Sequence, residues 1–186
     1  LVRSQVSEGD LSNATNLFET AARIGQELHR CGKSYEAVPY FQHALYLKNK
    51  SITQEPVHIQ KVFADILFDL GVIHTRSRGD KAKAIQAFQL CLDLRKVVYG
   101  PDHPSVASVF YSLADIYGSL GDMECAENLL QEALSILLFN CRRRDHLKHV
   151  WLALSKVQKA LGEEAEAKSL DPPPTPQHCA CLGNYF

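Results

Sequence analysis

Cysteine and histidine are the residues of this chain most able to do chemistry, because they bind metals, act as nucleophiles and transfer protons. The six cysteines include no CxxC pair, and the eight histidines are scattered along the sequence. Cys141 lies near His146 and His149, but positions 141 and 146 of one helix point to different faces and no fourth ligand is apparent. We therefore expect no metal site and no cofactor.

Sequence motifs of enzyme catalysis are missing. The chain contains no GxSxG, no HExxH, no Walker-type glycine loop and no GxGxxG. A site assembled in space from His74, Cys91 and Asp115 is an alternative, although such residues usually serve packing or solvation. We therefore predict a protein that is not an enzyme and has no catalytic residues.

Composition and charge describe an ordinary globular chain. Its 186 residues are 46% hydrophobic and 22% charged, which excludes a disordered chain, a collagen-like repeat and a coiled coil. The net charge of −1 gives no general attraction for phosphate, so we expect no nucleic-acid partner. No apolar run reaches the roughly 20 residues of a membrane-spanning helix, so we expect no membrane insertion.

The cysteines also bear on location. Four of the six lie in segments with helical apolar spacing, where a free thiol acts as a small hydrophobic group, and this favours the reducing cytoplasm. The chain begins at Leu1 and holds one methionine, Met123, which is compatible with a fragment or processed form whose targeting signal would precede Leu1.

Four glycines mark a repeat along the chain. Gly32, Gly79, Gly121 and Gly162 are separated by 47, 42 and 41 residues. Small residues recur five and twelve positions after the first three glycines, and a large residue nine positions after: Ala37, Phe41 and Ala44; Ala84, Phe88 and Cys91; Ala126, Leu130 and Ala133. The fourth copy fails at its ninth and twelfth positions, Asp171 and Pro174, where proline cannot continue a helix.

Each glycine follows a segment with the apolar spacing of a helix, and Trp151 stands in the last of these segments. The pattern predicts a helix, a turn at glycine and an antiparallel second helix, with small residues where the two backbones approach. Pro56 and Pro104 should each start a helix, and Asp102 or His103 can cap the second of these. We predict helices at 12–30, 34–49, 56–77, 81–98, 104–119, 123–139 and 145–161, and a short final turn at 164–169.

These spacings resemble the tetratricopeptide repeat (TPR). The copy that runs from Gly100-Pro101-Asp102-His103-Pro104 through Leu113-Ala114-Asp115-Ile116-Tyr117 to Ala133-Leu134-Ser135-Ile136 is similar to the longer repeats of kinesin light chains and nephrocystin-type proteins. The resemblance implies an all-α solenoid of antiparallel helix pairs, a right-handed superhelix with about three full repeats and a truncated fourth pair. The residues that pack the repeats together would be Gly32, Ala37, Phe41 and Ala44; Gly79, Ala84, Phe88 and Cys91; Gly121, Ala126, Leu130 and Ala133; and Trp151.

The sequence also predicts a domain layout. A poorly ordered flank would occupy residues 1–11, a repeat domain residues 12–170 and an extended proline-rich tail residues 171–186. Within the domain, the repeats would lie at about 12–50, 56–99, 104–140 and 145–170. The tail contains His178, Cys179 and Cys181, which could bind metal or carry a lipid, and an unstructured end with exposed thiols is the simpler interpretation.

In this family the first helices line a concave groove, which would be the partner-binding surface. The corresponding positions here are Glu19, Ala22, Gln26 and His29; Asp65, Phe68, Asp69 and Val72; Ser108, Tyr111, Asp115 and Ser119; His149, Leu152, Lys156 and Lys159. Phe68 and Tyr111 would supply apolar contact area, unless they pack against the next helix pair. Lys156 and Lys159 would present positive charge near one end.

Two groove chemistries of the family are poorly supported. A lysine and asparagine clamp for a terminal carboxylate is absent, because its positions hold Ala22, Gln26, Asp69 and Val72. The paired asparagines of kinesin light chains are replaced in the best copy by Tyr111 and Ser112.

We therefore expect a non-enzymatic scaffold that binds a protein, as a peptide or partner helix, in the groove. The alternative is a structural segment of a larger solenoid, or a motor-type or cilium-type adaptor, that mediates spacing or self-association. A helical-repeat reader of RNA would need a basic groove, and the acidic groove positions argue against it.

Overall fold

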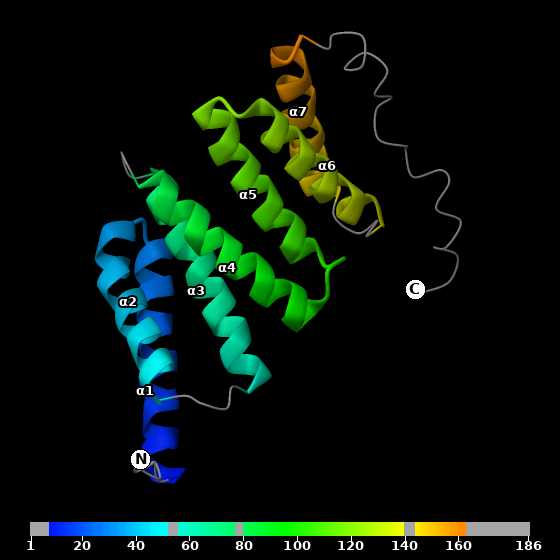
Figure 1. Cartoon of the computed structure of the whole chain (residues 1–186). Coiled ribbons are helices and arrows are strands. Elements are labelled where there is room, and N and C mark those ends of the chain that lie inside the picture. Colours follow the sequence, from blue (N-terminus) through cyan, green and yellow to red (C-terminus); the bar gives the residue numbers. More distant parts are fainter. Residues whose placement is uncertain (1–7, 52–55, 77–79, 140–143, 163–186) are drawn as a thin grey trace, which may run out of the picture. The chain divides into compact units, whose positions relative to one another are not determined.

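The computed structural model describes residues 8–51, 56–76, 80–139 and 144–162, and these residues form helices and turns without a strand. Figure 1 shows the helices: α1 (Glu8–Arg30), α2 (Ser34–Ser51), α3 (Val57–Arg76), α4 (Lys81–Tyr99), α5 (Pro104–Leu120), α6 (Met123–Phe139) and α7 (Arg144–Ala160). The predicted helices match these closely. Helix α1 starts at Glu8, four residues earlier than predicted, and Pro56 precedes the first residue of α3 instead of starting the helix.

The chain divides into two compact units on either side of the bond between Val98 and Tyr99. In the first unit, α1 and α2 form an antiparallel pair joined at Gly32, and both helices contact α3. Gly32 has a φ of 81°, a left-handed conformation that glycine adopts without steric cost, and its N–H donates to the oxygen of His29 at 3.0 Å. The glycine thus ends α1 and reverses the chain.

Two glycines inside the first helices of this unit make room for phenylalanines on the second helices. A Cβ added to Gly25 would lie 2.6 Å from the ring of Phe41, and one added to Gly71 would lie 2.6 Å from the ring of Phe88. Both rings are buried, with exposed fractions of 0% and 1%. The α1–α2 and α3–α4 pairs therefore each contain a close contact between glycine and phenylalanine.

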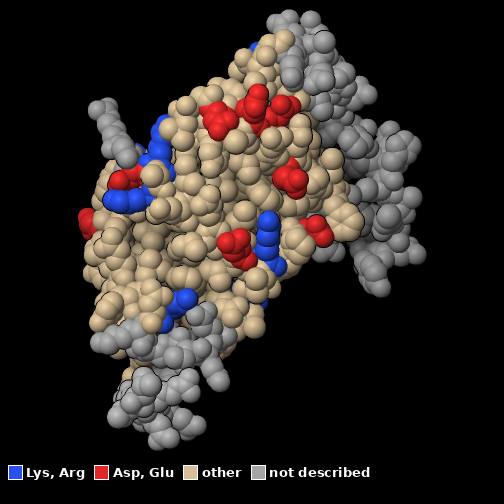
Figure 2. Space-filling model, viewed as in Figure 1, with Lys and Arg blue, Asp and Glu red and all other residues tan. Residues whose placement is uncertain are grey.

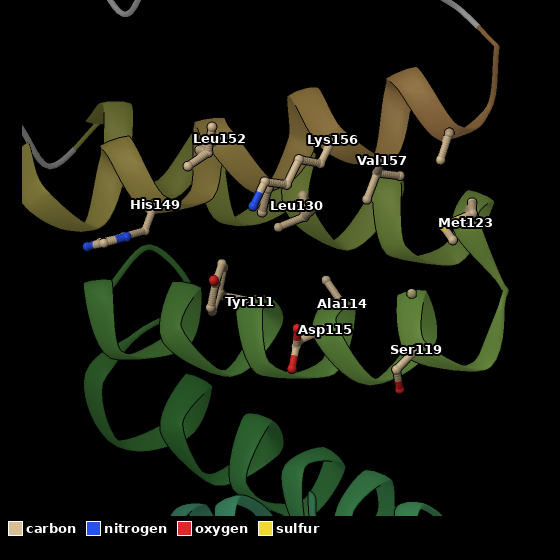
Figure 3. A pocket seen from close by; sticks show the side chains of 13 residues that line it. Tyr111, Ala114, Asp115, Ser119, Met123, Leu130, His149, Leu152, Lys156 and Val157 are labelled. Atoms are coloured by element: carbon tan, nitrogen blue, oxygen red, sulfur yellow. The ribbon is translucent and has the colours of Figure 1, made fainter.

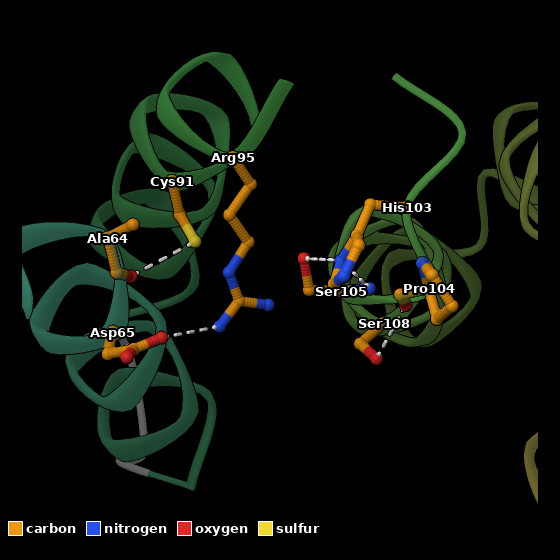
Figure 4. A network of polar contacts seen from close by, with 8 residues as sticks. All are labelled: Ala64, Asp65, Cys91, Arg95, His103, Pro104, Ser105 and Ser108. Carbon is orange, nitrogen blue, oxygen red and sulfur yellow. Dashed lines mark hydrogen bonds and ion pairs between the residues drawn. The ribbon is translucent and has the colours of Figure 1, made fainter. Parts of the chain in front are cut away.

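The second unit is an antiparallel α5–α6 pair with α7 packed on α6. Pro104 is the first residue of α5, and the Nδ1 atom of His103 accepts a hydrogen bond from the Ser105 N–H at 3.2 Å, which caps the helix as expected (Figure 4). Gly121 ends α5 with a φ of 88°. Between α6 and α7, the Gln158 side chain donates to Glu127 at 2.9 Å.

The small and large residues that follow the repeat glycines are buried: Ala37, Phe41, Ala44, Ala84, Phe88, Cys91, Ala126, Leu130 and Ala133. Trp151 is half-buried on α7. Gly79 lies outside the described residues, as do the final turn expected at 164–169 and the tail at 171–186. The first helix of the fourth pair is therefore in place as α7.

Candidate partner-binding surface

Four of the predicted groove residues lie on α3 in the first unit: Asp65, Phe68, Asp69 and Val72. Arg95 of α4 reaches this set, as Figure 4 shows for Asp65, and its Nη2 lies 3.2 Å from the Asp65 Oδ1. The same guanidinium lies 4.5 Å from the ring centroid of Phe68, in cation–π geometry. The Phe68 ring also meets the Phe88 ring at 5.6 Å with an interplanar angle of 66°.

Phe68 is thus held within its own helix pair. One of its contacts comes from the Arg95 guanidinium and another from the Phe88 ring. Arg95 is itself buried, with 9% of its side chain exposed, whereas the Asp65 side chain is 48% exposed. The α3 surface therefore presents carboxylate to a partner more readily than it presents an aromatic ring.

Burial shifts two titratable groups beside Arg95. Desolvation raises the pKa of Asp69 to about 6; the positive field of His29 opposes this shift, and the carboxylate of Asp65 adds to it. Desolvation also raises the pKa of the Cys91 thiol to about 12, and its Sγ donates a hydrogen bond to the oxygen of Ala64 at 3.2 Å. Cys91 is therefore an inert packing residue and not a nucleophile.

A cavity of about 520 Å³ lies in the second unit, where α5, α6 and α7 meet (Figure 3). This volume falls within the range of roughly 300–1,000 Å³ that is usual for ligand pockets. The lining residues are Tyr111, Ala114, Asp115, Gly118 and Ser119 from α5; Met123 and Leu130 from α6; and His149, Leu152, Ala153, Lys156, Val157 and Ala160 from α7. We call this site the α5–α7 pocket.

The α5–α7 pocket brings together six of the residues that the sequence placed on groove positions: Tyr111, Asp115, Ser119, His149, Leu152 and Lys156. In Figure 3, Tyr111 extends from α5 towards α7, and Lys156 extends from α7 towards α5. Tyr111 is half-buried, while Asp115 and Lys156 are exposed. The site is an open pocket with an apolar floor and charged groups on both sides.

Two other predicted groove residues of this unit do not line the α5–α7 pocket. The Ser108 hydroxyl donates to the Pro104 oxygen at 3.2 Å, and Lys159 is exposed on α7. Together with the four α3 residues, they stay predictions as partner contacts.

Sequence reasoning missed Arg95 and much of the pocket floor. Arg95 stands seven residues after Phe88, and Lys48 stands seven after Phe41. Lys48 also lies over an aromatic ring, with its Nζ 4.4 Å from the centroid of Phe63. A basic residue at this place of the repeat was therefore a signal available in the sequence.

Metal-binding groups and membrane-spanning helices are both absent from the part of the chain that the structure describes. The described residues contain no group of three or more His, Cys, Asp or Glu side chains arranged to hold a metal ion. None of the described helices is long and apolar enough to cross a membrane.

Comparison with known proteins places this chain in the class of helical-repeat proteins. A family model described as "Tetratricopeptide repeat" matches residues 62–138, and a second model with the same description matches residues 18–51. Together the two matches cover more than half of the chain. The chain belongs to the tetratricopeptide-repeat family.

Solved structures agree with this assignment. A protein assigned as a kinesin light chain from Podosopora anserina, with nearly identical TPR-like repeats, is 18% identical with a TM-score of 0.64, over 82% of this chain and 71% of that one. BtubC (BKLC) from P. vanneervenii is 20% identical with a TM-score of 0.67, over 100% of this chain and 74% of that one. No curated protein matches significantly. The fold is an all-α helical-repeat solenoid that resembles kinesin light chain.

Proposed function

We propose that this protein is a scaffold that binds a peptide or a partner helix at the first helices of its repeats, with the α5–α7 pocket as the main contact. Tetratricopeptide repeats are protein–protein interaction modules, so a protein partner follows from the family. The observation that carries the finer proposal is the pocket itself, which gathers Tyr111, Leu152 and Lys156 from two first helices around one cavity.

The lining of the α5–α7 pocket suits a side chain of a partner protein. Leu130 and Val157 provide apolar floor, and Tyr111 adds a ring with a polar end. A few side chains seated in well-packed pockets, most often aromatic residues or arginine, usually dominate the affinity of protein interfaces. Asp65 and Asp69 on α3 would then contribute to the choice of partner through charge.

Catalysis is not part of the proposal, because the tetratricopeptide-repeat family is typically non-enzymatic. We propose the cytoplasm as the location. The three cysteines that the structure describes as free thiols, Cys31, Cys91 and Cys125, support a reducing compartment.

The proposal is tested by partner capture with a double variant, Tyr111→Ala with Leu152→Ala. We expect the variant to lose captured partners while it keeps its helical content, because both side chains line the pocket and neither is fully buried. Tyr35→Ala is the matched control, since Tyr35 is an aromatic residue on α2 with 71% of its surface exposed. Full capture by the double variant would contradict the proposal.

A further inference from the structure

Residues of opposite charge line the two sides of the α5–α7 pocket. Asp115 lies on α5, and Lys156 lies on α7 together with His149. Asp115 and Lys156 do not pair with one another, and neither has an ion-pair partner among the described residues. Both residues are exposed in the part of the chain that the structure describes.

The same contrast between acidic and basic residues continues in the sequence outside the pocket lining. Residues 104–139, which form α5 and α6, contain five acidic residues and no Lys or Arg: Asp115, Asp122, Glu124, Glu127 and Glu132. Residues 144–160, which form α7, contain four Lys or Arg residues and a single acidic one: Arg144, Lys148, Lys156 and Lys159, with Asp145. Figure 2 shows acidic side chains gathered over α5 and α6 on the visible face.

An apolar floor between two walls of opposite charge favours one arrangement of a bound segment. Exposed charges contribute little affinity singly, but they penalise a partner that places like charges against them. A segment with a basic residue at α5 and an acidic residue at α7 places each charge beside the opposite charge of the pocket, at Asp115 and at Lys156. The same segment turned around meets like charge at Asp115 and at Lys156.

We propose that the α5–α7 pocket binds a peptide segment with a large apolar side chain, flanked by a basic residue on one side and an acidic residue on the other. The apolar side chain enters the pocket, the basic residue lies at Asp115 and the acidic residue lies at Lys156. The charges fix the direction in which the segment lies across α5 and α7. This inference rests on the proposed function, because it needs a peptide in the pocket.

A displayed library of random dodecapeptides, selected on the purified chain, tests the inference. Peptides that depend on the pocket are those enriched on the unchanged chain and not on the Tyr111→Ala variant. We expect them to share an apolar residue with a basic residue on one fixed side and an acidic residue on the other. On a charge-swapped chain, Asp115→Lys with Lys156→Glu, the order of the two charges should reverse.

The expected size of the effect is about threefold to tenfold in Kd between a selected peptide and its charge-reversed counterpart, as for two partly exposed ion pairs. The matched control swaps an exposed ion pair, Lys33 in the turn before α2 and Glu36 on α2, which lie 3.6 Å apart, and leaves the net charge unchanged. This control should keep the original order of charges in the selected peptides.

The outcomes separate the two proposals. Pocket-dependent peptides with no fixed order of charges, or with an order that the swap does not reverse, would overturn the inference and leave the proposed function standing. If no peptide is enriched on the unchanged chain relative to Tyr111→Ala, the proposed peptide site fails, and the inference fails with it.

Discussion

The α3–α4 pair and the α5–α6 pair share one repeat design but treat the same surface differently. Asp65 and Phe68 lie six and three residues before Gly71, and Arg95 lies seven residues after Phe88. In α3–α4, the guanidinium of Arg95 pairs with Asp65 at 3.2 Å and covers Phe68 at 4.5 Å. A residue of the second helix thus contacts the predicted groove residues of the first.

At the matching places of α5–α6, the chain has Ser108, Tyr111 and Leu137. Leu137 is a buried apolar residue and carries no charge to place over the ring. Tyr111 lines an open pocket instead. The two pairs therefore differ at one matching place of the second helix, where Arg95 contacts the aromatic residue of the first helix in α3–α4 and the uncharged Leu137 stands in α5–α6.

The two pairs also differ in the residues that pack where their helices approach most closely. Gly71 leaves room for the Phe88 ring, whereas Ala114 and Leu130 stand at the corresponding places of α5–α6, and both are buried. A methyl group gained on one helix is matched by a smaller side chain on the other, which conserves the packed volume.

The largest expected effect on the stability of the protein comes from the removal of the Phe68 ring. We expect Phe68→Ala to lower the free energy of unfolding by about 2–4 kcal/mol, because the ring packs on Phe88 and Arg95. Urea denaturation followed by circular dichroism measures this change. A loss well below 1 kcal/mol would show that the ring is not an internal packing element.

The contact between glycine and phenylalanine should come next in size. Gly71→Ala places a Cβ 2.6 Å from the buried Phe88 ring, so we expect a loss of roughly 1–2 kcal/mol in the free energy of unfolding despite the better helix propensity of alanine. Adding Phe88→Leu, which reproduces the Ala114 and Leu130 arrangement, should recover part of this loss. Additive effects of the two substitutions in a double-mutant cycle would refute the volume compensation.

Tyr111→Ala should have a smaller effect on stability than Phe68→Ala. Because Tyr111 is half-buried at the pocket, we expect its removal to change the free energy of unfolding by about 1 kcal/mol or less. The same urea titration compares the two variants directly. Equal losses would mean that both rings serve packing and that the contrast between the helix pairs is wrong.

A separate expected effect is the pH dependence of stability that comes from Asp69, because burial raises the pKa of this carboxyl group from 3.8 to about 6. The folded chain therefore holds a proton at a pH where the unfolded chain has lost it. Asp69 then contributes stability that is present below about pH 3.8 and is lost as the pH rises through about 6. Asp69→Asn should remove this contribution, and urea denaturation of both proteins at several pH values measures it; parallel curves would contradict it.

The sequence predicted the helices well because the signals are local. The glycine spacing, the apolar period of the first helices and the proline at position 104 each act over a few residues, and they located the bounds of α2 to α7 within about two residues. The start of α1 was placed four residues late, since the segment before residue 12 carries no comparable apolar pattern.

The candidate site was only partly predictable. Family positions found the pocket residues on the first helices, among them Tyr111 and Lys156, because each repeat places equivalent side chains alike. They did not find Met123 and Val157 in the floor, which depends on how α5, α6 and α7 converge in space. Arg95 was missed because a long side chain from a second helix reaches a surface assigned to the first.

The most direct test of the contrast between α3 and the α5–α7 pocket is site-specific photocrosslinking to a captured partner. A benzophenone amino acid is placed at Leu152, which lines the pocket and is 50% exposed, and in a separate protein at Val72, which is half-buried on α3. We predict a crosslinked partner from position 152 and a much weaker product from position 72. Crosslinking that is stronger at position 72, or absent at position 152 while the partner is captured, would contradict the account.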